Sequence, residues 1–122
     1  MSTTREVLRS LLMEFNRNSG ALASALVTRD GILISSALPE DVDAEAFAAM
    51  TATMVGAAET AFSELKAGAA ERVIVEGSRT KIVAVGAGEN VILVAMASRE
   101  ATLGLILHEM RKLSDKIKKV LS

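Results

Sequence analysis

The sequence contains no cysteine, tryptophan or tyrosine, and it has a single histidine and a single proline. Without cysteine, the chain has neither a disulfide framework nor a thiolate that could act as a nucleophile. A transition-metal site of the usual kind is excluded as well, because such sites combine several cysteine and histidine ligands. We therefore expect no metal, and the lack of cysteine is compatible with a reducing cytosol.

Aromatic residues make up only 2% of the chain, although 50% of it is hydrophobic. Its core must therefore be filled by Ala, Val, Leu, Ile and Met. The 122 residues suffice for one hydrophobic core, so we expect one domain over residues 1–122. The near balance of 14 basic and 15 acidic residues argues against a nucleic-acid footprint. No run approaches the ~18 apolar residues of a membrane span and no signal peptide is evident, so we expect a soluble, cytoplasmic protein.

Motifs for catalysis and nucleotide binding are missing too. No serine lies in a G-x-S-x-G turn, and there is no G-x-x-x-x-G-K-[ST] loop. Gly86-Ala87-Gly88 resembles the start of a phosphate-binding loop, but a predicted strand follows it where a helix N-terminus is needed. His108 lies beside the apolar stripe of a predicted helix, so we interpret it as an ordinary helical residue. We expect no catalytic group, no cofactor and no enzymatic activity.

Residues 21–38, ALASALVTRDGILISSAL, contain the strongest local signal. Two runs of β-favouring apolar residues flank Asp30-Gly31, a pair typical of hairpin turns because such turns need positive φ. Leu26 and Val27 are neighbours, as are the apolar residues 32–34, so both faces of these strands are apolar. This pattern predicts a hairpin within a sheet that is covered on both sides.

The spacing of the apolar residues predicts three helices and three further strands. Thr3 and Glu6 have capping-box spacing and open a helix over residues 4–16. Asp43 begins a helix that extends to about residue 66, with Gly68 as its stop. Ser98 is expected to cap a last helix, whose basic final turns fit the helix dipole better than a lipid or nucleic-acid contact. The expected strands are 71–76, 80–85 and 91–97, an antiparallel meander, and the expected last helix is 99–121.

The helix predicted over residues 43–66 has two unlike faces. Its apolar stripe, predicted to face the core, consists of Phe47, Met50, Met54, Ala58, Ala61 and Leu65, with Thr51, Val55 and Phe62 along one flank. The opposite side has small residues where a solvent-facing helix normally carries Lys and Glu. Either a second helix packs closely against this side, or the helix is simply alanine-rich and has no partner. The small residues are Ala49, Ala52, Thr53, Gly56, Thr60 and Ser63.

The order helix, hairpin, long helix, three-stranded meander, helix resembles that of the Roadblock/LC7 family. The resemblance rests on residues 27–36 around the turn, on Asp43-Ala44-Glu45 and on Thr102-Leu103-Gly104. It implies an α+β fold, an α/β/α sandwich. In it, a five-stranded antiparallel sheet of order 2-1-5-4-3 carries the first and last helices on one face and the middle helix on the other. It also implies homodimers or heterodimers, formed through the middle helix and the third strand, that act as platforms for small Ras-like GTPases or as parts of motor complexes.

An argument from dimensions also predicts a partner. Five strands span ~24 Å whereas one helix is ~10 Å across, so the middle helix cannot cover its face of the sheet alone. We expect a homodimer in which the small-residue sides of two helices pack antiparallel and Val73 and Val75 bring two edge strands together. Four arginines are candidate contacts for a GTPase, with ordinary surface solvation as the alternative for each. They are Arg29, Arg72, Arg79 and Arg99.

The expected function is a non-enzymatic homodimeric scaffold or regulator of a small Ras-like GTPase. Two alternatives remain: a small-ligand sensor of the PAS kind, which shares the strand order, and a structural interaction module. Ligand pockets of the PAS kind usually have aromatic walls, so the lack of Trp and Tyr weakens the sensor interpretation.

Overall fold

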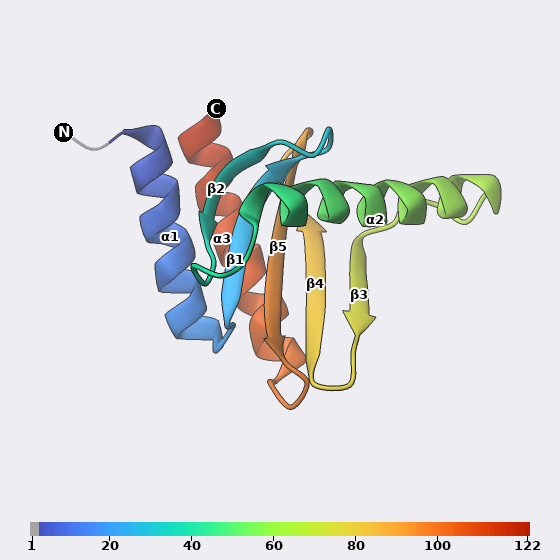
Figure 1. Ribbon diagram of the computed structural model, residues 1–122. Coiled ribbons are helices and arrows are strands. Elements are labelled where there is room, and N and C mark those ends of the chain that lie inside the picture. Colours follow the sequence, from blue (N-terminus) through green and yellow to red (C-terminus); the bar gives the residue numbers. More distant parts are fainter. Residues whose placement is uncertain (1–2) are drawn as a thin grey trace.

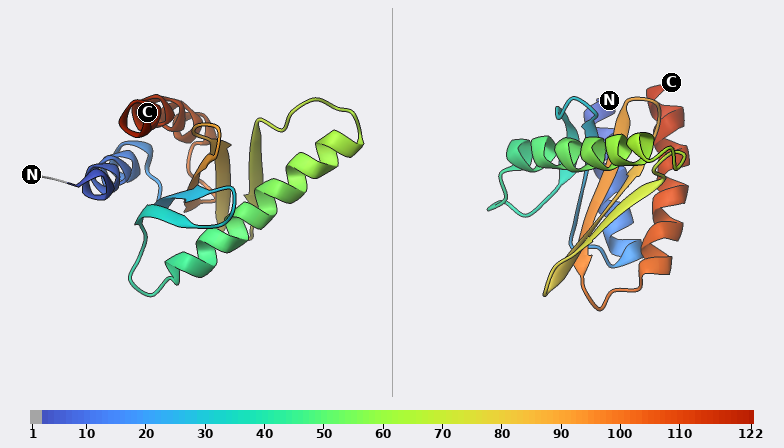
Figure 2. Two further views of the ribbon diagram at one scale, coloured as in Figure 1. Left: turned by 90° about the horizontal axis from the view of Figure 1, so that it is seen from above. Right: turned by 90° about the vertical axis from the view of Figure 1, so that its right-hand side faces the viewer.

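The computed structural model describes residues 3–122 and consists of one sheet between two layers of helices (Figures 1 and 2). The strands form one antiparallel sheet in the order β2-β1-β5-β4-β3. Helices α1 and α3 lie on one face and α2 crosses the other, so the predicted fold class is confirmed. The elements are α1 (Thr4–Ser19), β1 (Ala23–Thr28), β2 (Leu33–Ala37), α2 (Ala44–Glu64), β3 (Arg72–Glu76), β4 (Thr80–Gly86), β5 (Val91–Ser98) and α3 (Leu103–Leu121).

Helix α1 has the start that its sequence predicts. The backbone N–H of Glu6 donates to the hydroxyl of Thr3 at 3.1 Å, which satisfies one of the free N–H groups of the first turn. The helix ends at Ser19, three residues later than predicted. The hydroxyl of Ser19 donates to the carbonyl of Phe15 at 2.7 Å, and Gly20 then ends the helix with a φ of 76°.

The hairpin of β1 and β2 turns at Asp30-Gly31 as predicted. Gly31 has a φ of 91°, and its N–H donates to the carbonyl of Thr28 at 2.9 Å. The pairing of the two strands shifts between Leu26 and Val27, which marks a bulge or irregularity. Except for Thr28 at its end, β1 is buried throughout, as expected of a strand that is covered on both faces.

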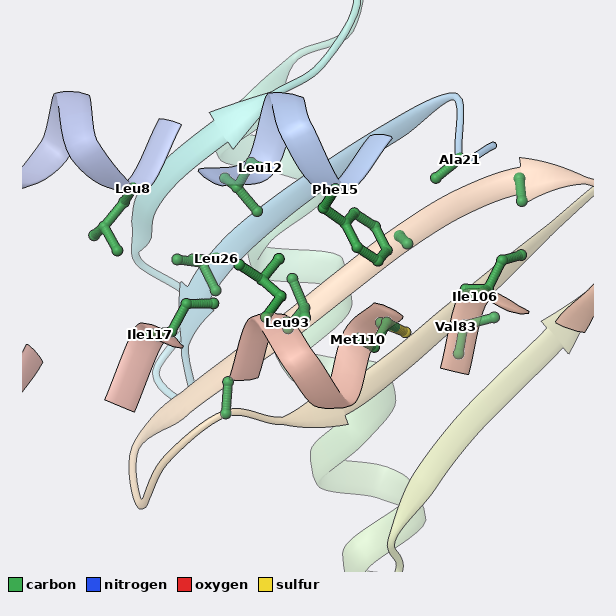
Figure 3. Packing of buried hydrophobic residues seen from close by; sticks show 14 residues of the cluster. Leu8, Leu12, Phe15, Ala21, Leu26, Val83, Leu93, Ile106, Met110 and Ile117 are labelled. Carbon is green, nitrogen blue, oxygen red and sulfur yellow. The ribbon is translucent and has the colours of Figure 1, made fainter. Parts of the chain in front are cut away.

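Two hydrophobic clusters fill the space on either side of the sheet. The larger one has fourteen buried residues and lies between the sheet and helices α1 and α3, with Leu12, Leu93 and Met110 among its members (Figure 3). The smaller one has seven buried residues and includes Val55 of α2, Val27 and Ile92. The face under α2 is therefore the less completely covered face of the sheet.

The connection from β5 to α3 differs from the prediction. Helix α3 begins at Leu103 with Thr102 as its N-cap, so the expected cap by Ser98 is wrong. The hydroxyl of Ser98 instead donates to the carboxylate of Glu100 at 2.6 Å within a turn. The amine of the buried Lys81 donates to the carbonyl of Ala101 at 2.6 Å and holds this turn against β4. Residues 99–102, which were expected to begin the helix, thus form the turn between β5 and α3.

Candidate protein-interaction surface

Helix α2 meets the sheet with the flank of the predicted stripe that carries Thr51 and Val55. Phe47 and Met54 of the stripe itself also pack against the hydrophobic cluster beneath the helix. The buried residues of α2 are Ala48, Thr51 and Val55, roughly a quarter turn away from the predicted stripe. Met50 is 68% exposed and Leu65 is 77% exposed, so these two members of the stripe do not face the core. Met50 and Leu65 are thus apolar side chains that the chain itself does not cover.

The second half of α2 extends beyond the sheet. The helix continues past β3, the last strand, and its end has no strand beneath it (Figure 1). The residues from Thr60 to Glu64 are all exposed, and the exposed fraction of Phe62 is 40%. An apolar ring and an apolar leucine on an overhanging helix are typical of a surface that is covered by another chain.

The small-residue side of α2 divides into two parts. A Cβ on Gly31 would lie 3.3 Å from the Cα of Ala49 and 3.7 Å from the Cβ of Ala52, so these two alanines give room to the hairpin of the same chain. Beyond them, a Cβ at Gly56 would meet no atom within 4 Å. Among the predicted positions, Thr53, Thr60 and Ser63 are likewise exposed.

Strand β3 continues this surface at the edge of the sheet. It pairs only with β4, so its outer edge has no strand partner within residues 3–122. Val73 packs against the hydrophobic cluster under α2, and Val75, two residues on, shares that face and is 43% exposed. An open edge with apolar side chains is a template for pairing with a second strand. We call Gly56, Phe62, Leu65, the edge of β3 and the small residues Thr53, Thr60 and Ser63 the α2–β3 surface.

Arg29 has a structural role that its sequence context does not reveal. Its guanidinium forms an ion pair with Glu59 of α2 at 2.7 Å, and its Nε donates to the carbonyl of Glu89 at 3.0 Å. These contacts tie the β1–β2 turn to the middle of α2 and to the β4–β5 turn. Glu59 and Glu89 lie thirty and sixty residues further along the chain, and no local pattern predicts such partners.

The other three candidate arginines are not brought together with Arg29. Arg72 lies at the start of β3, 4.0 Å from Glu71, on the half of the sheet that also carries the β1–β2 turn. Arg79 and Arg99 meet at the opposite end, where the N–H of Arg99 donates to the carbonyl of Arg79 at 3.0 Å. The structure therefore offers no cluster of these four side chains.

Within residues 3–122, no three His, Asp or Glu side chains converge in a way that could hold a metal. The hydrogen bond from Ser98 lowers the pKa of Glu100 below its ordinary value, but this carboxylate lies on an exposed turn. Buried side chains fill the space between α2 and the sheet, where a PAS-like sensor would hold its ligand. No helix in the described part of the chain has the length and apolar character needed to span a membrane.

The fold and this surface define an α/β/α sandwich domain with features for association with another chain: an overhanging helix and an open sheet edge. Residues 8–97 match the Roadblock/LC7 domain. The chain is also 42% identical to "Uncharacterized protein MJ0714" of Methanocaldococcus jannaschii over 108 residues, which are 88% of this chain and 91% of that protein. The chain belongs to the Roadblock/LC7 domain family.

Solved structures share the same fold. MglB of Myxococcus xanthus superposes with a TM-score of 0.87 at 24% identity, and the match covers 93% of this chain and 86% of MglB. A Roadblock/LC7 domain from Streptomyces avermitilis also has a TM-score of 0.87, at 22% identity, over 93% of this chain and 96% of that domain. At these identities the similarity establishes a common fold.

Proposed function

We propose that the chain is a non-enzymatic subunit that forms a symmetric homodimer through the α2–β3 surface and acts as a scaffold for a small Ras-like GTPase. Membership of the Roadblock/LC7 family and the fold shared with MglB support a scaffolding or regulatory role. The absence of a converging group of reactive side chains in residues 3–122 is compatible with that role. In this function the chain supplies a rigid surface, and the bound nucleotide belongs to the partner.

The overhang of α2 is the observation that carries the dimer. A helix that covers only part of a sheet and then leaves it exposes apolar side chains, here Phe62 and Leu65. Burying a large apolar side chain completely is worth about 1.5–3 kcal/mol, so covering this end of the helix favours association. A second copy whose α2 packs antiparallel across the open side at Gly56, and whose β3 continues the sheet, also places strand surface beneath the overhanging end, on the side of the helix that carries Phe62.

The edge of β3 suits the same two-fold arrangement. Two copies of β3 that pair antiparallel turn two five-stranded sheets into one continuous sheet and remove the open edge of each. Val75 then meets apolar side chains of the second copy on the face that α2 covers. A stable interface of standard size buries about 1,600 Å² in total, and a helix and a strand from each copy provide a surface of that order.

Replacement of Gly56 by leucine tests the dimer. Because the space around Gly56 is open within one chain, Gly56→Leu should leave the fold intact and should break or distort the dimer. Gly104→Leu is the matched control, since a Cβ at Gly104 on α3 also meets nothing within 4 Å. Light scattering should find a dimer for the unmodified protein and for the control. A monomeric unmodified protein at micromolar concentration would refute the proposal.

We place the GTPase on the side of the dimer that carries the two α2 helices, because a two-fold pair of helices provides one composite surface. Two routes to faster hydrolysis are available to such a complex. An inserted arginine stabilises the transition state by as much as ~10³–10⁵-fold in rate, whereas a rigid platform can position the catalytic residues of the GTPase itself. We favour positioning, because it demands no reactive group from this chain and because Arg29 is already bound to Glu59.

The two routes can be separated with a purified Ras-like GTPase from the same genome. Under positioning, alanine variants of Arg72, Arg79 and Arg99 that still bind the GTPase should keep its full rate of GTP hydrolysis. Complete loss of stimulation in one binding-competent variant would overturn the preference for positioning. As a control, calorimetry of this chain alone with GTP or ATP should detect no binding, since it has no phosphate loop.

A further inference from the structure

A groove runs between α3 and β3, on the face of the sheet opposite α2. Helix α3 packs over β4 and β5, where Ile106 and Met110 meet Val83 and Leu93 in the larger hydrophobic cluster (Figure 3). Strand β3 lies beyond the helix (Figure 2) and has the exposed residues Arg72, Ile74 and Glu76 on this face. The space between the helix and this strand is a groove of about 210 Å³. We call it the α3–β3 groove.

Three cationic side chains line the α3–β3 groove. Arg72 comes from β3, and Arg111 and Lys118 come from α3, about two helical turns apart. Within residues 3–122, neither Arg111 nor Lys118 has a carboxylate within 4.0 Å, whereas Arg72 lies 4.0 Å from Glu71. Glu71 and Asp115 also line the groove, so three positive charges stand against two negative ones. The groove therefore keeps two cations that are free to bind a carboxylate.

The floor of the groove combines apolar surface with a polar group that has no partner. Val85, Leu107 and Met110 provide the apolar part. The hydroxyl of Ser114 is buried without a hydrogen-bond partner among the described residues, and the residue itself is only 6% exposed. Leaving such a group unpaired costs free energy, which a bound backbone amide or carbonyl would recover once the hydroxyl turns toward the groove.

The charges of the two faces differ in sign. Helix α3 has five basic residues and two acidic ones, whereas residues 39–64, which form α2 and the loop before it, have six acidic residues and no basic one. An acidic partner is therefore attracted to the side of α3 and repelled from the side of α2. A recess with an apolar floor fits an extended peptide better than a flat lipid surface, because a peptide can insert a side chain into it.

We propose that the α3–β3 groove docks an extended acidic segment of a partner protein. Its carboxylates lie against Arg111, Lys118 and Arg72, and one of its apolar side chains covers Leu107 and Val85. This site goes beyond the proposed scaffold function, since it faces away from the surface assigned to the GTPase. All its lining residues come from one chain, and β3, which carries Arg72, also forms the edge of the α2–β3 surface.

Fluorescence anisotropy tests the site in the full chain. The probe is a short fluorescein-labelled peptide of aspartates with a leucine at every third position, and the reference peptide has asparagine in place of each aspartate. The acidic probe should bind and the asparagine peptide should not. The double variant Arg111→Glu/Lys118→Glu should weaken binding by about tenfold or more, a loss of about 1.4 kcal/mol. The matched control Arg17→Glu/Lys119→Glu makes the same change in net charge on exposed residues outside the groove and should bind as well as the unmodified protein.

The serine provides a second, independent measurement. Ser114→Ala should weaken peptide binding several-fold while raising or preserving thermal stability, because it removes an unpaired hydroxyl and favours the helix. Equal weakening by both double variants, accompanied by equal loss of binding to phosphatidylserine vesicles, would assign the effect to general surface charge and overturn the proposal. Unchanged binding by Arg111→Glu/Lys118→Glu would also overturn it. Gly56→Leu should still bind the peptide, which separates this site from the proposed dimer.

Discussion

Gly31→Ala is expected to destabilise the protein by about 2–3 kcal/mol, for two separable reasons. Gly31 has a φ of 91°, a conformation that costs an L-residue roughly 1–2 kcal/mol. Its new Cβ would also lie 3.3 Å from the Cα of Ala49, a backbone atom of α2 that cannot move aside without shifting the helix. The substitution therefore forces the hairpin away from α2 as well as straining the turn.

A second glycine isolates the backbone cost. Gly20 also has a positive φ, of 76°, but a Cβ added there would meet no atom within 4 Å. Gly20→Ala should therefore cost only the conformational part, about 1–2 kcal/mol, less the few tenths regained by restricting the unfolded chain. Any excess cost in Gly31→Ala measures the packing of the turn against α2.

Urea unfolding, followed by far-ultraviolet circular dichroism, provides the comparison. All variants are measured at one protein concentration, because association makes the apparent stability depend on concentration. Gly31→Ala should unfold at a lower urea concentration than Gly20→Ala with a similar slope of free energy against urea. If Gly31→Ala proves no less stable than Gly20→Ala, the close approach of turn and helix does not constrain this position, and the reasoning is wrong.

Three further predictions concern the core, the ion pair and one carboxylate. Leu12→Ala removes a fully buried side chain and should cost about 2–5 kcal/mol in chemical denaturation. Glu59→Gln removes the charge that Arg29 binds; because both side chains are partly exposed, its cost should be only about 0.3–1 kcal/mol and should shrink at high salt. Ser98→Ala should raise the pKa of Glu100 toward its ordinary value in an NMR titration. Folding lowers the pKa of Glu100, so this contact stabilises the folded chain fully at pH values above the ordinary pKa of the carboxyl group. The stabilisation is lost as the pH falls through the pKa of Glu100 in the folded chain.

Local signals along the chain were sufficient to predict much of the fold. The cap at Thr3, the turn at Asp30-Gly31 and the start of α2 after Asp43 depend on residues close in sequence, and all three occur as predicted. The rotation of α2 was predicted only in part: Thr51 and Val55 are buried as expected, but Met50 is exposed. The helix carries more apolar residues than its contact with the sheet covers, so the apolar stripe alone does not specify which side faces the sheet.

Contacts between distant segments left no trace in the sequence pattern. Arg29 was singled out as a candidate contact for a GTPase, but its partner Glu59 lies on another element and nothing near either residue indicates the pair. The α3–β3 groove likewise depends on which strands α3 covers, because the groove lies between the helix and the first strand that it leaves uncovered. Composition and periodicity do not specify the position of a helix across a sheet. Nothing in the sequence around Ser114 indicates that its hydroxyl is buried without a hydrogen-bond partner. The packing of a second helix on the small-residue side of α2 stays a prediction, and Ala49 on that side lies beside the hairpin of the same chain.

In the proposed homodimer, the overhang of α2 links folding to the amount of protein present. In a lone copy, the exposed end of the helix from Thr60 to Glu64 has no strand beneath it, and helical segments shorter than ~12 residues are marginal in water without tertiary packing. These turns should therefore open and exchange their amide hydrogens rapidly at high dilution, and become protected as a second copy packs against them. Any partner that binds across this end of the helix then meets an ordered surface only above the concentration at which copies pair. Even a partner that contacts only one copy would then bind more tightly as the concentration of this chain rises. The level of expression of this chain would therefore control the binding of that partner.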